Sequence, residues 1–188
     1  MESDAAYDEV EEDVQMDALY ELAECYADGD GVERDQVKAA QLYQEAAEMG
    51  HMDASYKLAE CYAYGRGVER DQVKAVRFYT QAAEMGHVDA AFKLAKCYAC
   101  GWGVDQDEVL ATKFYRQAAK AGFGPAKLEL GIRLLRGLGV PQDLTEAEQW
   151  LTQALPGGLL EPEERLVHIK RKNVGRKGRR IPVKPENR

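Results

Sequence analysis

Four cysteines are the residues of this sequence that most readily suggest chemistry. Cys25, Cys61 and Cys97 recur at intervals of 36 residues, and Cys97 also forms a C-x-x-C pair with Cys100. A structural zinc site would need a second such pair, and a redox motif would need strands on either side of a helix; the sequence supplies neither. We therefore predict reduced thiols with packing or surface roles, and no metal or other cofactor.

Histidine, serine and glycine also give no catalytic pattern. His51 and His87 each follow a glycine that ends a predicted helix, where an imidazolium would interact favourably with the negative end of the helix dipole, so we expect capping there. The two serines, Ser3 and Ser55, lie in no nucleophile motif. The Gly-x-Gly pairs follow predicted helices instead of strands, which argues against phosphate binding. The sequence therefore predicts a protein that is not an enzyme.

The interval of 36 residues reflects a repeat that covers most of the chain. Four blocks align in register, at residues 17–52, 53–88, 89–124 and 125–160. A period of this length corresponds to two short helices, and within the first block we expect the first helix at about residues 17–27 and the second between Asp35 and Gly50. Stacking is required because one helix pair cannot bury both of its apolar faces. We thus predict an all-α solenoid of stacked helix-turn-helix repeats.

Short polar residues and glycines mark the expected helix ends. Asp35 is a predicted N-cap of the second helix, because its carboxylate can accept the first free backbone N–H groups. Asp17, Asp53 and Asp89 are predicted N-caps of the first helices for the same reason. Gly29 and Gly31 end the first helix of the first block, since glycine adopts the left-handed conformation at little cost.

The two ends of the chain differ from the repeats. Residues 1–16 form an acidic segment that we interpret as an N-terminal extension or a half-repeat cap. Residues 161–170 open with Pro162 near a helix start and are a predicted polar capping helix. Residues 171–188 are basic, contain glycine and proline, and are a predicted disordered tail.

Charge is distributed unevenly along the chain. The net charge of -8 argues against a protein that coats nucleic acid along its whole surface. The C-terminal segment is nevertheless basic, and it could be a nuclear-localisation signal, a nucleic-acid contact or an intramolecular partner for the acidic body. It contains no aromatic residue, so any nucleic-acid contact would be to phosphates and sensitive to salt. The candidate polyanion-binding residues are Lys170, Arg171, Lys172, Arg176, Lys177, Arg179 and Arg180.

Hydropathy indicates no membrane span. No apolar run approaches the roughly 18 residues that a transmembrane helix requires. The N-terminus has neither the basic start nor the apolar segment of a signal peptide. We expect a soluble, cytoplasmic protein, with the basic segment also allowing a nuclear location.

The repeat carries a family pattern, which is clearest in the second block. Its elements are Leu58-Ala-Glu-Cys-Tyr62, Gly65-x-Gly67-Val68, Asp71-x-x-Lys74-Ala75 and Ala82-Ala83-Glu84-x-Gly86. This pattern resembles the Sel-one-like repeat (SLR) family, a relative of the tetratricopeptide repeat. The fourth block departs from it, with Leu134 and Leu151 in place of the repeat tyrosines. The resemblance implies a right-handed α-solenoid that serves as an adaptor in protein complexes.

Differences between repeats indicate where a partner would bind. Positions that serve the shared stack should match from block to block, whereas positions that serve a specific partner can differ. The largest contrasts lie at the end of the first helix and between the paired glycines, and an exposed row with Tyr, Trp and Arg has the composition of an interaction hot spot. The alternative is that these are loop positions that vary without constraint. The candidate partner-binding residues are Tyr64, Arg66, Cys100, Trp102 and Arg136.

Two functions follow from these features. The first is a non-enzymatic adaptor or scaffold whose solenoid surface binds a peptide or a protein partner. The second is a protein associated with nucleic acid or another polyanion through its basic C-terminal tail.

Overall fold

A computed structural model describes residues 2–154 and, within them, the side chains from residue 13 onward. This part of the chain contains eight helices and no strand. They are α1 (Glu2–Asp28), α2 (Gln36–Glu48), α3 (Met52–Tyr64), α4 (Gln72–Glu84), α5 (Val88–Cys100), α6 (Glu108–Lys120), α7 (Gly124–Arg136) and α8 (Leu144–Ala154). The predicted capping helix at 161–170, the basic tail at 171–188 and all candidate polyanion-binding residues lie outside the described residues.

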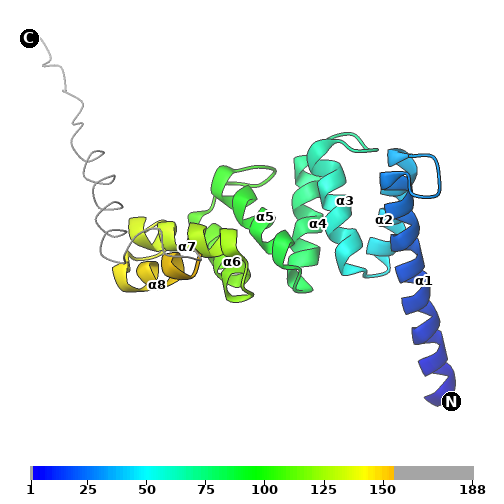
Figure 1. Ribbon diagram of the computed structural model, residues 1–188, viewed down its shortest axis with the longest axis horizontal. Coiled ribbons are helices and arrows are strands. Elements are labelled where there is room, and N and C mark those ends of the chain that lie inside the picture. The colour runs from blue at the N-terminus through cyan, green and yellow to red at the C-terminus, as the bar shows by residue number, and fades with distance from the viewer. Residues whose placement is uncertain (1, 155–188) are drawn as a thin grey trace, which may run out of the picture.

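The helices form four antiparallel pairs that follow one another along the long axis of the molecule (Figure 1). The closest packing is within each pair and between the second helix of one pair and the first helix of the next. Buried alanines such as Ala59 and Ala95 let the backbones approach, and Leu58, Leu94 and Tyr79 fill the space between them. The predicted all-α solenoid of stacked helix pairs is confirmed.

The first helix is longer than its repeat predicts. The sequence places its start near Asp17, but α1 begins at Glu2 and continues without a break to Asp28. Residues 2–16 therefore share one helix with the first repeat, and Asp17 lies inside that helix, where it cannot act as an N-cap.

The helix starts follow two rules. Asp35, Asp71 and Asp107 are the N-caps of α2, α4 and α6, and each carboxylate accepts hydrogen bonds from two backbone N–H groups. The prediction for Asp35 is therefore confirmed. At α3 and α5 the N-caps are His51 and His87, not Asp53 and Asp89.

The histidine caps act through an acceptor nitrogen. His51 Nδ1 accepts from the backbone N–H of Ala54 at 3.0 Å, and His87 makes the equivalent bond to Ala90 at 3.1 Å. Each Nε2 faces an aspartate on the first helix of the preceding pair: His51 faces Asp17 of α1 at 3.4 Å, and His87 faces Asp53 of α3 at 3.3 Å. The sequence predicted that these histidines cap the end of the preceding helix as imidazolium ions. That prediction is wrong, because they cap the start of the following helix. They do so through Nδ1 as a hydrogen-bond acceptor, and an Nδ1 that accepts carries no proton.

The paired glycines of each loop have different roles. Gly65 and Gly101 end α3 and α5 in the left-handed conformation, as their spacing predicts. In the second, third and fourth repeats the second glycine, such as Gly103 with a φ of +72°, lies against the backbone at the start of the second helix of the preceding repeat; Gly31 of the first repeat has no such neighbour. This contact fixes how far apart neighbouring repeats lie.

Within residues 2–154, every helix is too short or too polar to span a bilayer.

Candidate partner-binding pocket

We call the place where the second helix pair meets the third the second junction. A pocket of about 430 Å³ lies there. α3 and α5 form its sides, and the loops after them and the start of α4 complete it. Its lining residues are Ala63, Tyr64, Arg70, Gln72, Tyr79, Lys93, Lys96, Cys97 and Trp102.

Aromatic and cationic side chains meet at the mouth of this pocket. Tyr64 and Trp102 are about half exposed, at 55% and 49% of their surface. Lys96 Nζ lies 6.0 Å from the centre of the Trp102 ring, within the range of a cation–π contact. Lys93 Nζ donates to the Tyr64 hydroxyl at 3.3 Å and to Glu60 at the same distance. The mouth therefore offers both apolar surface and positive charge.

The floor of the pocket is buried and uncharged. Tyr79 is almost fully buried, and burial raises the pKa of its hydroxyl far above the ordinary value.

Burial alone would lower the pKa of Lys93, but the Tyr64 hydroxyl and the Glu60 carboxylate raise it overall, so this ammonium stays charged at neutral pH. The positive charge of the site is thus permanent under physiological conditions.

The first junction, between the first and second helix pairs, contains the repeat equivalent of this pocket. It is smaller, at about 130 Å³, and three of its lining residues are acidic. Asp28, Glu60 and Arg66 stand there in the places that Tyr64, Lys96 and Trp102 take in the second junction. The difference in size and charge between the two pockets follows from these three positions.

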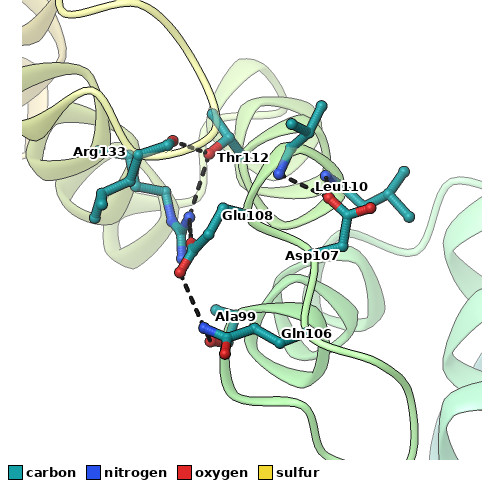
Figure 2. A network of polar contacts seen from close by, with 9 residues as sticks. Ala99, Gln106, Asp107, Glu108, Leu110, Thr112 and Arg133 are labelled. Atoms are coloured by element: carbon teal, nitrogen blue, oxygen red, sulfur yellow. Dashed lines mark hydrogen bonds and ion pairs between the residues drawn. The ribbon is translucent and has the colours of Figure 1, made fainter.

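The equivalent place in the third junction is occupied by a buried arginine. Arg133 stands at the repeat position of Cys97 and reaches from α7 to α6, where it bonds to Glu108 at 2.7 Å and to Thr112 at 3.3 Å (Figure 2). Its guanidinium also lies 4.8 Å from the centre of the Tyr115 ring. The side chain therefore covers the tyrosine that corresponds to the pocket floor in the second junction.

The structure brings together two of the five predicted partner-binding residues, Tyr64 and Trp102, in one pocket. Arg66 lines the first junction instead, with its guanidinium 5.0 Å from the centre of the Tyr64 ring. Cys100 and Arg136 are exposed at the ends of α5 and α7 and do not line the pocket of the second junction.

Sequence comparison missed the cations of the second junction, Arg70, Lys93 and Lys96. A signal for Lys96 was present, because the repeat position that it occupies is glutamate in the first two blocks, at Glu24 and Glu60. Arg70 and Lys93 match their counterparts in the preceding block, Arg34 and Lys57, but both positions change elsewhere in the chain: the Arg70 position is glutamine in the last two blocks, and the Lys93 position is glutamate in the first and the fourth.

The cysteine side chains are all free in the structure. Cys61 and Cys97 are buried, and burial raises the pKa of each thiol to about 11. Cys100 is exposed and makes no bond with Cys97. Within residues 2–154 no group of three or more His, Cys, Asp or Glu side chains is arranged to bind a metal ion.

Cysteine alkylation of the native protein at pH 8 should therefore be strongly site-selective. With a pKa of about 11, Cys61 and Cys97 have roughly one thiolate per thousand thiols at this pH, and burial further slows their reaction. We expect iodoacetamide to modify Cys100 first and the two buried thiols about a hundredfold more slowly or only on unfolding. Peptide mass spectrometry against time measures this order.

The same measurement on unfolded, unreduced protein should find four reactive thiols. A Cys25–Cys61 disulfide would contradict the geometry of the stack.

Comparisons with known proteins agree with this architecture. The family model described as "Sel1 repeat", which denotes the Sel-one-like repeat, matches residues 17–51, 53–87, 88–123 and 124–155. No curated protein sequence is significantly similar to the chain.

Several solved structures share this fold. The protein c5321 of uropathogenic Escherichia coli, a protective antigen displaying an SLR fold, is 30% identical with a TM-score of 0.76, and the match covers 85% of this chain and 34% of that one. A Sel1 repeat protein from Oxalobacter formigenes is 32% identical with a TM-score of 0.72, covering 74% and 57%. The immunity protein Pa5087 of Pseudomonas aeruginosa is 26% identical with a TM-score of 0.51, covering 74% and 52%. The chain thus spans about a third to just over half of the length of these proteins.

Proposed function

Because the chain belongs to the Sel1 repeat family, whose members generally mediate protein–protein interactions, we propose that it is a non-enzymatic scaffold that binds a protein partner at the second junction. The observation that carries the proposal is the pairing of two half-exposed aromatic side chains, Tyr64 and Trp102, around one pocket. Tyrosine and tryptophan at the mouth of a pocket are the residues most often found at the centre of protein interfaces.

The other junctions support the choice of this site. The first junction is small and has three carboxylates in its lining, one of which, Glu24, pairs with Lys57 at 2.9 Å. In the third junction Arg133 fills the corresponding space. Of these three equivalent places, the second junction offers the most open space and the most exposed aromatic surface.

Photo-crosslinking in the cells that naturally express the chain tests the proposal. A photoreactive phenylalanine analogue is placed at position 102 or, as the control, at position 30, the equivalent loop position of the first repeat. We expect covalent adducts with one protein partner from position 102 and none with that partner from position 30. Equal adducts from both positions, or none from either, would contradict the proposed site.

Affinity for the captured partner should then depend on the two aromatic side chains. Trp102→Ala and Tyr64→Ala should each weaken binding roughly thirtyfold, the loss expected for truncation of an aromatic hot-spot residue. The melting temperature should change little, because both side chains are half exposed and lie at the mouth of the pocket, outside the buried core. Deletion of residues 170–188 should leave capture intact; loss of capture on this deletion would favour the basic tail as the binding element.

A further inference from the structure

The lining of the second-junction pocket carries an excess of positive charge. Its charged residues are Arg70, Lys93 and Lys96, and none of its lining residues is acidic. This contrasts with the net charge of -8 for the whole chain and with the first junction, whose lining has three acidic and three basic residues. The pocket is a local basic site on an acidic protein, so its charge is not a general property of the surface.

Two of these cations have no carboxylate partner within the described residues. Lys93 pairs with Glu60 at 3.3 Å, but neither Arg70 nor Lys96 forms an ion pair with a residue of the described part of the chain. Lys96 is held instead near the rings of Phe92 and Trp102. Its ammonium is thus positioned next to apolar surface while its charge remains available to a ligand.

The surrounding frame is shared with the first junction. The other lining positions of the two pockets carry the same residues, including Ala63 and Ala27, Gln72 and Gln36, and Tyr79 and Tyr43. Gln72 and Gln36 also make the same hydrogen bond, to the carbonyl oxygens of Ala63 and Ala27. Changes at three positions on a common frame therefore convert a small, charge-balanced hollow into a larger basic and aromatic pocket.

We propose that this pocket binds an acidic peptide segment of the partner, with a glutamate or aspartate carboxylate at Lys96 and Arg70 and a neighbouring apolar side chain against Trp102 and Tyr64. The inference rests on the proposed function and specifies the chemistry of its partner. A volume of about 430 Å³ lies within the range of roughly 300–1,000 Å³ typical of ligand pockets. Charge-assisted hydrogen bonds supply the specificity for a carboxylate, and the two rings supply apolar contact.

A displayed library of random octapeptides, selected on the full-length protein, tests the inference. We expect selected peptides to place glutamate or aspartate next to a large apolar residue. A synthetic peptide of the selected sequence should bind measurably by isothermal titration calorimetry, and its isostere with glutamine or asparagine should bind roughly tenfold to a hundredfold more weakly.

Matched variants assign the binding to the pocket. Lys96→Glu should weaken the acidic peptide by at least about tenfold, whereas Lys113→Glu, the same charge change on the exposed face of α6, should alter affinity less than about twofold. The triple variant Tyr64→Asp, Lys96→Glu and Trp102→Arg installs the residues of the first junction. It should abolish binding with a nearly unchanged melting temperature, because the first junction already holds these side chains on the same frame.

The outcomes separate this inference from the proposed function. If the selected peptides contain no acidic residue but still lose affinity on Trp102→Ala, recognition of a carboxylate is overturned, whereas the proposed scaffold function is retained. Equal effects of Lys96→Glu and Lys113→Glu would also overturn recognition of a carboxylate. Failure to select any peptide would overturn peptide binding. The proposed function itself would be overturned only by the crosslinking results, which are no adducts from position 102 or equal adducts from positions 102 and 30.

Discussion

Gly103→Ala is expected to destabilise the protein by about 2–5 kcal/mol, the sum of a left-handed alanine and a steric clash in a packed region. Gly103 has a φ of +72°, and the added Cβ would lie 2.2 Å from the carbonyl oxygen of Gln72 and 2.9 Å from the amide nitrogen of Val73. Both are backbone atoms at the start of α4, so neither can move without displacing a helix. Thermal unfolding followed by circular dichroism should show a fall in melting temperature of roughly 10 °C.

Gly31 provides the matched control for this prediction. It is the equivalent glycine of the first repeat, with a φ of +70°, but no atom lies within 4 Å of the position its Cβ would take. Gly31→Ala should therefore cost only the roughly 1–2 kcal/mol of a left-handed alanine. The difference between the two variants measures the contact between repeats, and equal melting temperatures would show that this contact does not hold the stack together.

The same glycines show how far the sequence predicts the fold. The repeat period and the Gly-x-Gly spacing are sufficient to predict helix pairs and the left-handed ends at Gly65 and Gly101, because those depend on residues close in the chain. Gly67, Gly103 and Gly139, the second glycines of the later pairs, each contact a helix start about 30 residues earlier. A contact at that separation depends on how neighbouring pairs stack, which local propensity does not determine.

Helix capping illustrates a similar limit. Aspartate is a strong N-cap in general, and this correctly predicts Asp35. The same preference gave the wrong residue at α3 and α5, where the histidine two positions earlier provides the cap. Asp53 of α3 instead faces His87, the residue that caps α5. The competing interaction lies between repeats, so the pattern within one repeat could not reveal it.

The candidate site was also only partly predictable from the sequence. Comparison of the repeats identified Tyr64 and Trp102 because both positions change strongly from block to block. These residues are 38 positions apart, and the pocket they share with Lys93 and Lys96 exists only once α3 and α5 lie side by side. Residue type can therefore mark an unusual position, but the stack determines which unusual positions act together.

Arg133→Ala is expected to destabilise the protein by about 2–4 kcal/mol, because it removes one partner of a largely buried ion pair. The Arg133 side chain is 7% exposed and the Glu108 side chain is 37% exposed, so the remaining carboxylate would lose its main partner while partly shielded from water. The variant also removes the contact with the Tyr115 ring and the bond to Thr112 (Figure 2). Urea unfolding measures the loss.

The second junction supplies the rescue for this variant. There the residues equivalent to Glu108 and Arg133 are Gln72 and Cys97. These two form no ion pair, and Gln72 donates a hydrogen bond to the carbonyl oxygen of Ala63. The double variant Glu108→Gln, Arg133→Cys should therefore be more stable than Arg133→Ala by about 1–2 kcal/mol, since no carboxylate is left without a partner. If the double variant is instead the less stable of the two, then the arginine stabilises the stack mainly by filling space and not by pairing with Glu108. Binding of acidic peptides should be unchanged in both variants, because Arg133 does not line the pocket of the second junction.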